Sequence, residues 1–371
     1  MATAVGLAVG CSLITNAYDF SIGPQDGGAD IAVTPDAGTR DPRVCAHCPE
    51  NPTRPPCAPS SEADAGAESP RFFAVRSVDF GERRADWSSA DYSTGIDQDC
   101  SSREDGGLPD CKPHNAASTW SALPHGIDNA FATQVLAPIA ENAFDAGAVM
   151  LSTSISDAFA AGRDGLLIEV EQWNGQSDDQ AVSVSLYPSR GPTSHGTPTF
   201  AIDESWDVYP NDKISTSNAY VASGTLVADF GNGENDVWLR ASSGARVKLP
   251  IFGVVLIGSV ASATPRFVVA ASVQSLGQQI GFDHDIAQAA FGCGVKQSDP
   301  LTTAVQNLLG DAFDLGPKGQ SCKTMSVGIS LPAARVMGIG TQLGCAPVSC
   351  GPSACDDAGA PPIDASDATP E

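Results

Sequence analysis

The chain has 371 residues and carries 44 acidic side chains against 20 Lys and Arg, which gives a formal net charge of −24. This charge argues against a nucleic-acid-binding protein, because nucleic-acid phosphates bind Lys and Arg. It also argues against direct docking on anionic lipid head groups. Eleven Cys in one chain indicate export to an oxidising compartment.

A short apolar run, Ala2–Gly10, ends at Cys11, and a polar stretch begins directly after it. Residues Ala8-Val9-Gly10-Cys11 resemble a bacterial lipobox. In that family a signal peptidase cleaves before the Cys, whose thiol then carries a diacylglycerol. The resemblance implies a signal segment over residues 1–10, lipidation of Cys11 and a membrane anchor made of acyl chains. The alternative is an ordinary buried strand or helix that ends in Cys.

Ser12 would be the second residue of the mature chain, which resembles lipoproteins sorted to the outer membrane. The resemblance therefore implies a lipid-anchored protein at the outer membrane or cell surface. Residues 11–69 are rich in Pro, Gly, Asp and Ala and are predicted to be a flexible linker, because they cannot bury enough surface to offset ordering entropy. At roughly 5–6 Å × √n, such a linker reaches ~40 Å.

The segment from about residue 70 to 340 has the pattern of one β-rich globular domain. Ile168–Glu171 and Val182–Leu186 alternate apolar and polar residues, which predicts strands with one buried face. Asn174–Asp179 between them has the composition of a hairpin loop. Further strands are predicted over Phe72–Phe80, Ala219–Asp229, Val237–Ala241, Val247–Phe252, Val254–Val260 and Phe267–Val273.

Gly, Asn, Asp or Pro separates most of these strands at short intervals. This spacing predicts a mainly β fold, an antiparallel β-sandwich or jelly roll braced by disulfides, rather than a βαβ fold. Residues 341–371 are predicted to be an acidic, Cys-containing disordered tail.

Two or three accessory helices are predicted. Apolar residues recur at helical spacing in Ile127–Phe144, and Pro138 should kink or split that helix. Leu301–Phe313 carries an apolar stripe, with Asp299 as the N-cap and Pro300 as the first residue. Asp283-His284-Asp285 is predicted to begin a short helix at Ile286 rather than to form a site.

Removal of Cys11 by lipidation leaves ten of the eleven Cys, an even number that can pair completely. If the middle four pair among themselves, at least one disulfide must join the two outer groups. A Cys100–Cys111 bond would close an acidic loop, and a Cys293–Cys322 bond would pin the second helix to the sheet. The three groups of disulfide candidates are Cys45, Cys48 and Cys57, then Cys100, Cys111, Cys293 and Cys322, then Cys345, Cys350 and Cys355.

Four carboxylates on the predicted acidic loop could converge on calcium, which takes six to eight oxygen ligands. They are Asp97, Asp99, Asp105 and Asp110. Their spacing is not that of an EF-hand, so a solvated loop without metal is the alternative. Calcium is the one cofactor that the sequence suggests, because Cys45-Ala46-His47-Cys48 has no second Cys pair to complete a zinc site.

Several short runs carry a wider resemblance: Ile96–Cys100, Cys111-Lys112-Pro113, Gly126–Ala130 and Cys322–Gly328. Together they are similar to uncharacterised lipoproteins that occur in large paralogous sets in predatory soil bacteria. The resemblance spans roughly residues 70–340. It implies an envelope location and assigns no catalytic residue.

The chain lacks the H-E-x-x-H, G-x-S-x-G and P-loop motifs of known catalytic families. Trp206 is a candidate for stacking on a sugar ring, with burial in the core as the alternative. The sequence thus predicts a lipid-anchored envelope protein with a binding or structural role, whose partner is a polysaccharide or an envelope protein. The other interpretation is a secreted hydrolase whose active site is built from loop residues.

Overall fold

A computed structural model describes residues 56, 58–59, 68–81, 111, 129–143, 150–274, 282–291, 293–315 and 320–344. This part of the chain is mainly β, with an antiparallel sheet and a few helices. No helix in these ranges is long and apolar enough to cross a membrane. The first strand begins at Arg71 and the last ends at Gln342.

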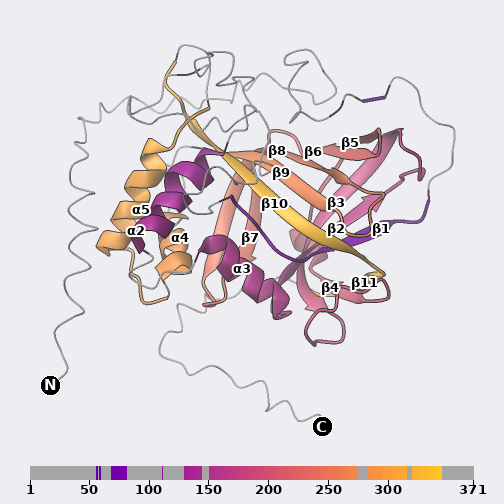
Figure 1. The fold of residues 1–371 in the computed structure, drawn as a ribbon, viewed down its shortest axis with the longest axis horizontal. Helices are drawn as coiled ribbons and strands as arrows, with labels where there is room; N and C mark the ends of the chain where they lie inside the picture. The colour runs from indigo at the N-terminus through magenta and orange to yellow at the C-terminus, as the bar shows by residue number, and fades with distance from the viewer. Residues whose placement is uncertain are drawn as a thin grey trace, which may run out of the picture.

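Eight strands close into a barrel, and each pairs antiparallel with the next (Figure 1). Around the ring they are β3 (Asp179–Pro192), β2 (Gly165–Glu171), β1 (Arg71–Val75), β10 (Thr324–Val336), β9 (Arg266–Gln274), β8 (Arg246–Ser259), β6 (Thr225–Asp229) and β5 (Ile214–Ala222). The ring closes because β3 pairs with β5 as well as with β2.

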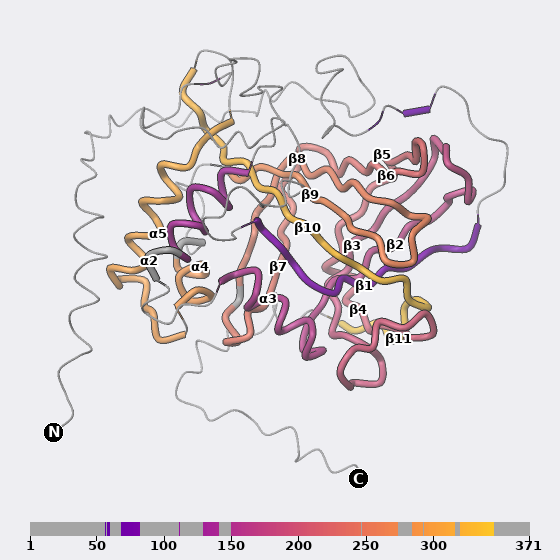
Figure 2. The backbone as a smooth tube through the Cα atoms, in the orientation of Figure 1, coloured from indigo at the N-terminus to yellow at the C-terminus, as the bar shows by residue number. Residues whose placement is uncertain are grey.

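Three shorter strands branch from this ring. β7 (Asn235–Arg240) pairs with the first half of β8. β4 (Ser205–Val208) pairs with the last residues of β3, and β11 (Gly338–Gln342) runs parallel to β4. We call β4, β11 and the connecting residues 193–204 the outer lobe, because they lie on the outside of the barrel, where the chain between β3 and β4 loops out beside β11 (Figure 2).

The prediction of a sandwich or jelly roll is wrong, because the sheet closes on itself. β3 and β8 are each 14 residues long, and each pairs with different strands along its two halves. Register shifts interrupt β3 opposite β5 and β8 opposite β9. Bulges of this kind bend and twist a strand, which allows a sheet to close. In β8 the shift includes Gly253, whose φ of 59° is a conformation that Gly adopts without steric penalty.

The outcome for individual strands is mixed. Ile168–Glu171 and Val182–Leu186 lie within β2 and β3, and the hairpin between them is confirmed. The prediction of one strand over Ala219–Asp229 is wrong, since a turn separates β5 from β6. In that turn Ser223 and Gly224 have positive φ values of 50° and 79°. The opposite error occurs in β8, which is a single strand where two were predicted.

Helical segments cover one side of the barrel, where α2, α4 and α5 lie together (Figure 1). They are the π-helix η3 (Phe131–Leu136), α2 (Ala137–Ala143), α3 (Leu151–Ala160), α4 (Phe282–Phe291) and α5 (Pro300–Asp311), with a 3-10 turn, η5 (Pro210–Asp212), after β4. The predicted start of α5 is confirmed, because the Asp299 side chain accepts from the amide of Leu301. Pro138 lies where η3 gives way to α2.

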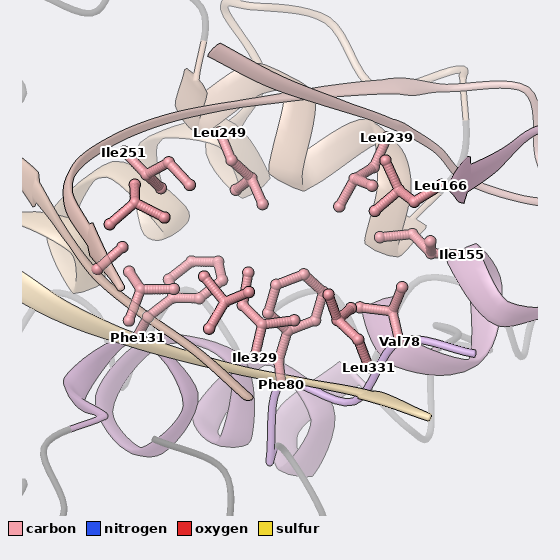
Figure 3. Close-up of a cluster of buried hydrophobic side chains, with 14 of the residues drawn as sticks. Val78, Phe80, Phe131, Ile155, Leu166, Leu239, Leu249, Ile251, Ile329 and Leu331 are labelled. Atoms are coloured by element: carbon pink, nitrogen blue, oxygen red, sulfur yellow. The ribbon is translucent and has the colours of Figure 1, made fainter. Parts of the chain in front are cut away.

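The barrel interior and the inner faces of the helices share one apolar core. Leu239, Leu249 and Ile251 of β7 and β8 face Phe131 of η3 and Ile329 of β10 across this core (Figure 3). An eight-stranded barrel is just wide enough for side chains to fill its interior.

A second, smaller core lies outside the ring, beneath the outer lobe. Its members come from both layers: Ala74, Leu167, Tyr187, Trp206, Val208 and Val336, with Phe72, Phe200 and Ile339 packed against them. Because of this cover, the outer face of β2 is buried as well as its inner face.

Candidate functional site

Cys111 and Cys322 form a disulfide between residues 211 positions apart. The bond confirms a disulfide-braced domain and corrects two pairings expected from sequence. Cys111 is not bonded to Cys100, and Cys322 is not bonded to Cys293, which is itself disulfide-bonded. Both expected pairings joined Cys residues that follow each other along the chain. The fold instead brings Cys322, two residues before β10, to the distant Cys111.

Most other residues singled out by the sequence lie outside the described ranges. They are Cys11, Cys45, Cys48, Cys57, Cys100, Cys345, Cys350 and Cys355, together with Asp97, Asp99, Asp105 and Asp110. Lipidation and calcium binding therefore stay predictions. Among the residues that the structure describes, no group of three or more His, Cys, Asp or Glu is placed to hold a metal ion.

Trp206 is fully buried, so its ring is not available to stack on a sugar and that prediction is wrong. The indole nitrogen donates to Glu204 at 3.2 Å, and the ring packs on Phe200 with 5.5 Å between centroids. On the barrel side it lies against Gly165, where an added Cβ would be 2.9 Å from the ring. Trp206 thus holds the outer lobe against β2.

Two of the short sequence runs meet in the fold. The Asn129 amide group donates to the carbonyl oxygens of Phe80 at 2.9 Å and Gly328 at 3.3 Å. In return the amide of Gly328 donates to the Asn129 side-chain oxygen at 3.1 Å. The amide of Ala130 donates to the Ser326 hydroxyl at 2.8 Å. The runs Gly126–Ala130 and Cys322–Gly328 therefore contact each other directly.

Asp314, just after α5, extends this contact. Its carboxylate accepts from both the amide and the hydroxyl of Ser326. We call Asn129, Asp314, Ser326 and Gly328 the buried junction. Asn129 is 1% exposed and Ser326 is 0% exposed, so no substrate reaches them. The junction joins η3, β10 and the segment after α5, and its chemistry is structural.

A second polar group lies in the outer lobe, where a buried carboxylate stands behind an exposed imidazole. The side chain of Asp207 is 2% exposed and that of His195 is 54% exposed, with 4.0 Å between Asp207 Oδ2 and His195 Nδ1. The other carboxylate oxygen accepts from the Thr193 hydroxyl at 2.7 Å and the Thr341 amide at 2.9 Å. Burial alone would raise the pKa of Asp207, but these hydrogen bonds outweigh it and the pKa lies below its usual value.

The surroundings of this pair are tight. An added Cβ at Gly340 would lie 2.0 Å from the Thr193 hydroxyl, so β11 approaches the pair as closely as a Gly allows. His195 and Phe200 have positive φ values of 55° and 54°. Such conformations are strained in residues other than Gly and are concentrated at functional sites. An ionised carboxylate behind an exposed imidazole can orient it to accept a proton.

An ion pair links the end of β7 to the start of β2. Arg240, the last residue of β7, lies 2.8 Å from the carboxylate of Asp164, which directly precedes β2. Burial raises the pKa of Asp164 to about 6, although Arg240 acts in the opposite direction. Burial, together with the charge of Asp164, also raises the pKa of Tyr209. Asp164 therefore changes its protonation state at about pH 6.

Tyr187 and Glu169 form a hydrogen-bonded pair on the outer face of β3 and β2. The Tyr187 hydroxyl donates to Glu169 at 2.7 Å. Burial raises the pKa of Glu169 despite this bond, and burial and the carboxylate together raise the pKa of Tyr187. Sequence analysis did not single out this pair, Asp207 or Asp164, since the partners come from separate parts of the chain and no fixed spacing joins them.

Comparison with known protein families, with curated proteins and with solved structures finds no match for this chain. The assignment of a function therefore depends on the chain's own residues and their contacts.

We expect Asn129→Ala to lower the free energy of unfolding by about 3 kcal/mol, because it leaves buried backbone groups of Phe80 and Gly328 without their partner. Urea unfolding monitored by circular dichroism measures the loss. Asn211→Ala is the control, since the side chain of Asn211 donates to the carbonyl of Gly344 in an exposed bond of 3.4 Å. Equal effects of the two substitutions would contradict the role of the junction.

Asp164 predicts a pH dependence of stability. Its folded-state pKa of about 6 lies above the ordinary value of 3.8, so its contribution is complete below the ordinary pKa and is lost as the pH rises through about 6. Between pH 4 and 7 the wild type should lose about 2 kcal/mol of unfolding free energy relative to Asp164→Asn. Urea unfolding across this range measures it.

Asp236→Asn removes an exposed carboxylate paired with Lys248 and is the matched control. It should keep the pH dependence of the wild type. If the free energies of unfolding of Asp164→Asn and the wild type change in parallel from pH 4 to 7, the raised pKa of Asp164 is disproved.

Proposed function

We propose that the chain is a lipid-anchored protein of the cell envelope, at the outer membrane or cell surface, with a binding or structural role. One observation carries this proposal: the disulfide between Cys111 and Cys322. Disulfides form and persist in oxidising compartments and are rare in the cytosol. Export through the lipobox-like segment that ends at Cys11 accounts for that oxidation and supplies the anchor.

The outer lobe is the surface best suited to a partner. Ile202 is 61% exposed and Met337 is 67% exposed, and they are the large hydrophobic side chains left exposed in the described ranges. Their backbone segments are in contact, because the amide of Met337 donates to the carbonyl of Glu204, two residues after Ile202, at 2.9 Å. Exposed apolar side chains gathered at one place favour contact with a protein. An envelope protein is therefore the partner that we favour over a polysaccharide.

A second candidate function, hydrolysis, is favoured by the pair of His195 and Asp207. In this interpretation His195 acts as a general base toward water, and the buried carboxylate orients its ring and stabilises its charged form. The 4.0 Å separation is longer than a hydrogen bond, so binding of a substrate would have to tighten the pair.

The anchor is tested on the native protein. Mass spectrometry should find a mature chain that begins at Cys11 and carries a diacylglycerol and an N-linked fatty acid. Cys11→Ser should stay uncleaved and leave the membrane fraction, because no acyl chain can be attached. Cys45→Ser, which changes another Cys near the N-terminus, should stay processed and membrane-bound. An unmodified chain that begins at Met1 would reject the proposal.

Hydrolysis is tested with a panel of p-nitrophenyl esters. If His195 is a general base, His195→Gln and Asp207→Asn should each lower the rate by about 100-fold or more. His284→Gln should leave the rate unchanged. His284 lies in α4, where its ring contacts the carbonyl oxygen of Val295 at 3.0 Å, away from the pair of His195 and Asp207. A wild-type rate no higher than that of buffer rejects this candidate.

A further inference from the structure

Part of the predicted linker lies against the barrel. The Tyr220 hydroxyl of β5 donates to the carbonyl oxygen of Pro56 at 2.7 Å. The Gln180 side chain of β3 donates to the carbonyl oxygen of Pro59. Between these two bonds, Ala58 packs on an apolar cluster on the outside of the barrel. In Figure 1 this segment is the short indigo piece above β5 and β6.

The surface beneath the segment has a defined composition. We call it the docking strip; its residues are Gln180, Tyr220, Ala222, Val227 and Val255. In β5, Ala219 and Val221 point into the main core, so Tyr220 and Ala222 face outward. Tyr220 is nevertheless only 2% exposed. An apolar strip on an outer face is stabilised by a cover, and the segment Pro56–Pro59 supplies one.

The chemistry of the contacts fits a proline-rich ligand. Pro has no N–H, so a proline-rich segment presents mainly acceptors, and a surface that recognises it must donate. Both hydrogen bonds run in that direction, from Tyr220 and Gln180 to the segment. The polyproline II helix repeats every three residues, so the carbonyls of Pro56 and Pro59 share one side of such a helix. Surfaces that bind proline-rich segments commonly use aromatic side chains, and Tyr220 is the aromatic residue of the docking strip.

We propose that the docking strip is a binding site for a proline-rich extended segment, occupied in cis by Pro56–Pro59. Its role is to fix the side of the barrel from which the membrane tether leaves, and this role rests on the proposed lipid anchor. β5 and β6 lie at the top of Figure 1, whereas β4 and β11 lie at the bottom. A tether clamped on the strip therefore leaves the outer lobe facing away from the point of attachment.

The test uses the full chain with Cys11→Ser, so that its outcome does not depend on acylation. A labelled peptide with the sequence of residues 53–60, with Ser in place of Cys57, is titrated while fluorescence anisotropy is recorded. Ala58→Asp opens the strip by placing a charge against its apolar residues. A second opened chain lacks residues 54–60. The peptide should bind both opened chains at least tenfold more tightly than the chain whose own segment occupies the strip.

Tyr220→Phe in the opened chain should weaken peptide binding about three- to tenfold, the effect of one hydrogen bond. Tyr187→Phe is the matched control and should change nothing, because it removes a Tyr hydroxyl elsewhere on the outer face of the barrel. Failure of the peptide to bind either opened chain overturns the proposal, as does equal binding by the occupied chain. So does a Tyr220→Phe effect no larger than that of Tyr187→Phe.

The state of association is measured in parallel by light scattering. The occupied chain should be a monomer. A dimer that becomes monomeric when residues 54–60 are deleted would overturn cis occupancy, since the segment would then come from a second copy. The two proposals can fail separately. If the peptide binds but the native protein is never lipidated, the docking strip is supported and the proposed function is rejected.

Discussion

The pairing of β3 with β5 is the constraint on which the rest of the structure depends. Without it the strands would form an open, strongly twisted sheet with two unpaired edges. With this pairing the ring has an interior that side chains fill and an outer face with apolar residues that other parts of the chain cover. The outer lobe and the docking strip lie against this outside, whereas the helices share the core of the barrel interior. Candidate functional residues therefore lie on outer surfaces and not in the barrel interior.

Sequence patterns identified the hairpin of β2 and β3. Apolar and polar residues alternate in Ile168–Glu171 and Val182–Leu186, and the turn between them has its expected residues, so local rules were sufficient there. The prediction of one wet face is wrong for both segments, because Glu169 and Ser185 are buried as well. Thr324–Val336 was not predicted as a strand, although it forms β10. It pairs with β1 and β9 in the ring and is buried along most of its length, and a strand of this kind has no alternation to detect.

The candidate sites were less accessible to such reasoning. Asp207 meets Thr341 only because β11 runs back beside β4, and it meets His195 because β4 folds back on the end of β3. Trp206 was misplaced for the same reason, since the outer lobe that buries it consists of short strands with little signal of their own. The contact of the runs around Asn129 and Ser326 was also invisible, although both runs had stood out in the sequence.

The disulfide has a consequence for the order in which the chain folds. β1 and β10 are neighbours in the ring, yet Cys111 and Cys322 lie between them along the chain, and the other six ring strands fall inside the covalent loop. Oxidation therefore shortens the path that separates β1 from β10 and lowers the entropy lost when they meet. In a reduced chain the pairing of β1 with β10 is a contact of very high sequence separation, the kind that forms slowly. Formation of the disulfide should therefore speed the pairing of β1 with β10.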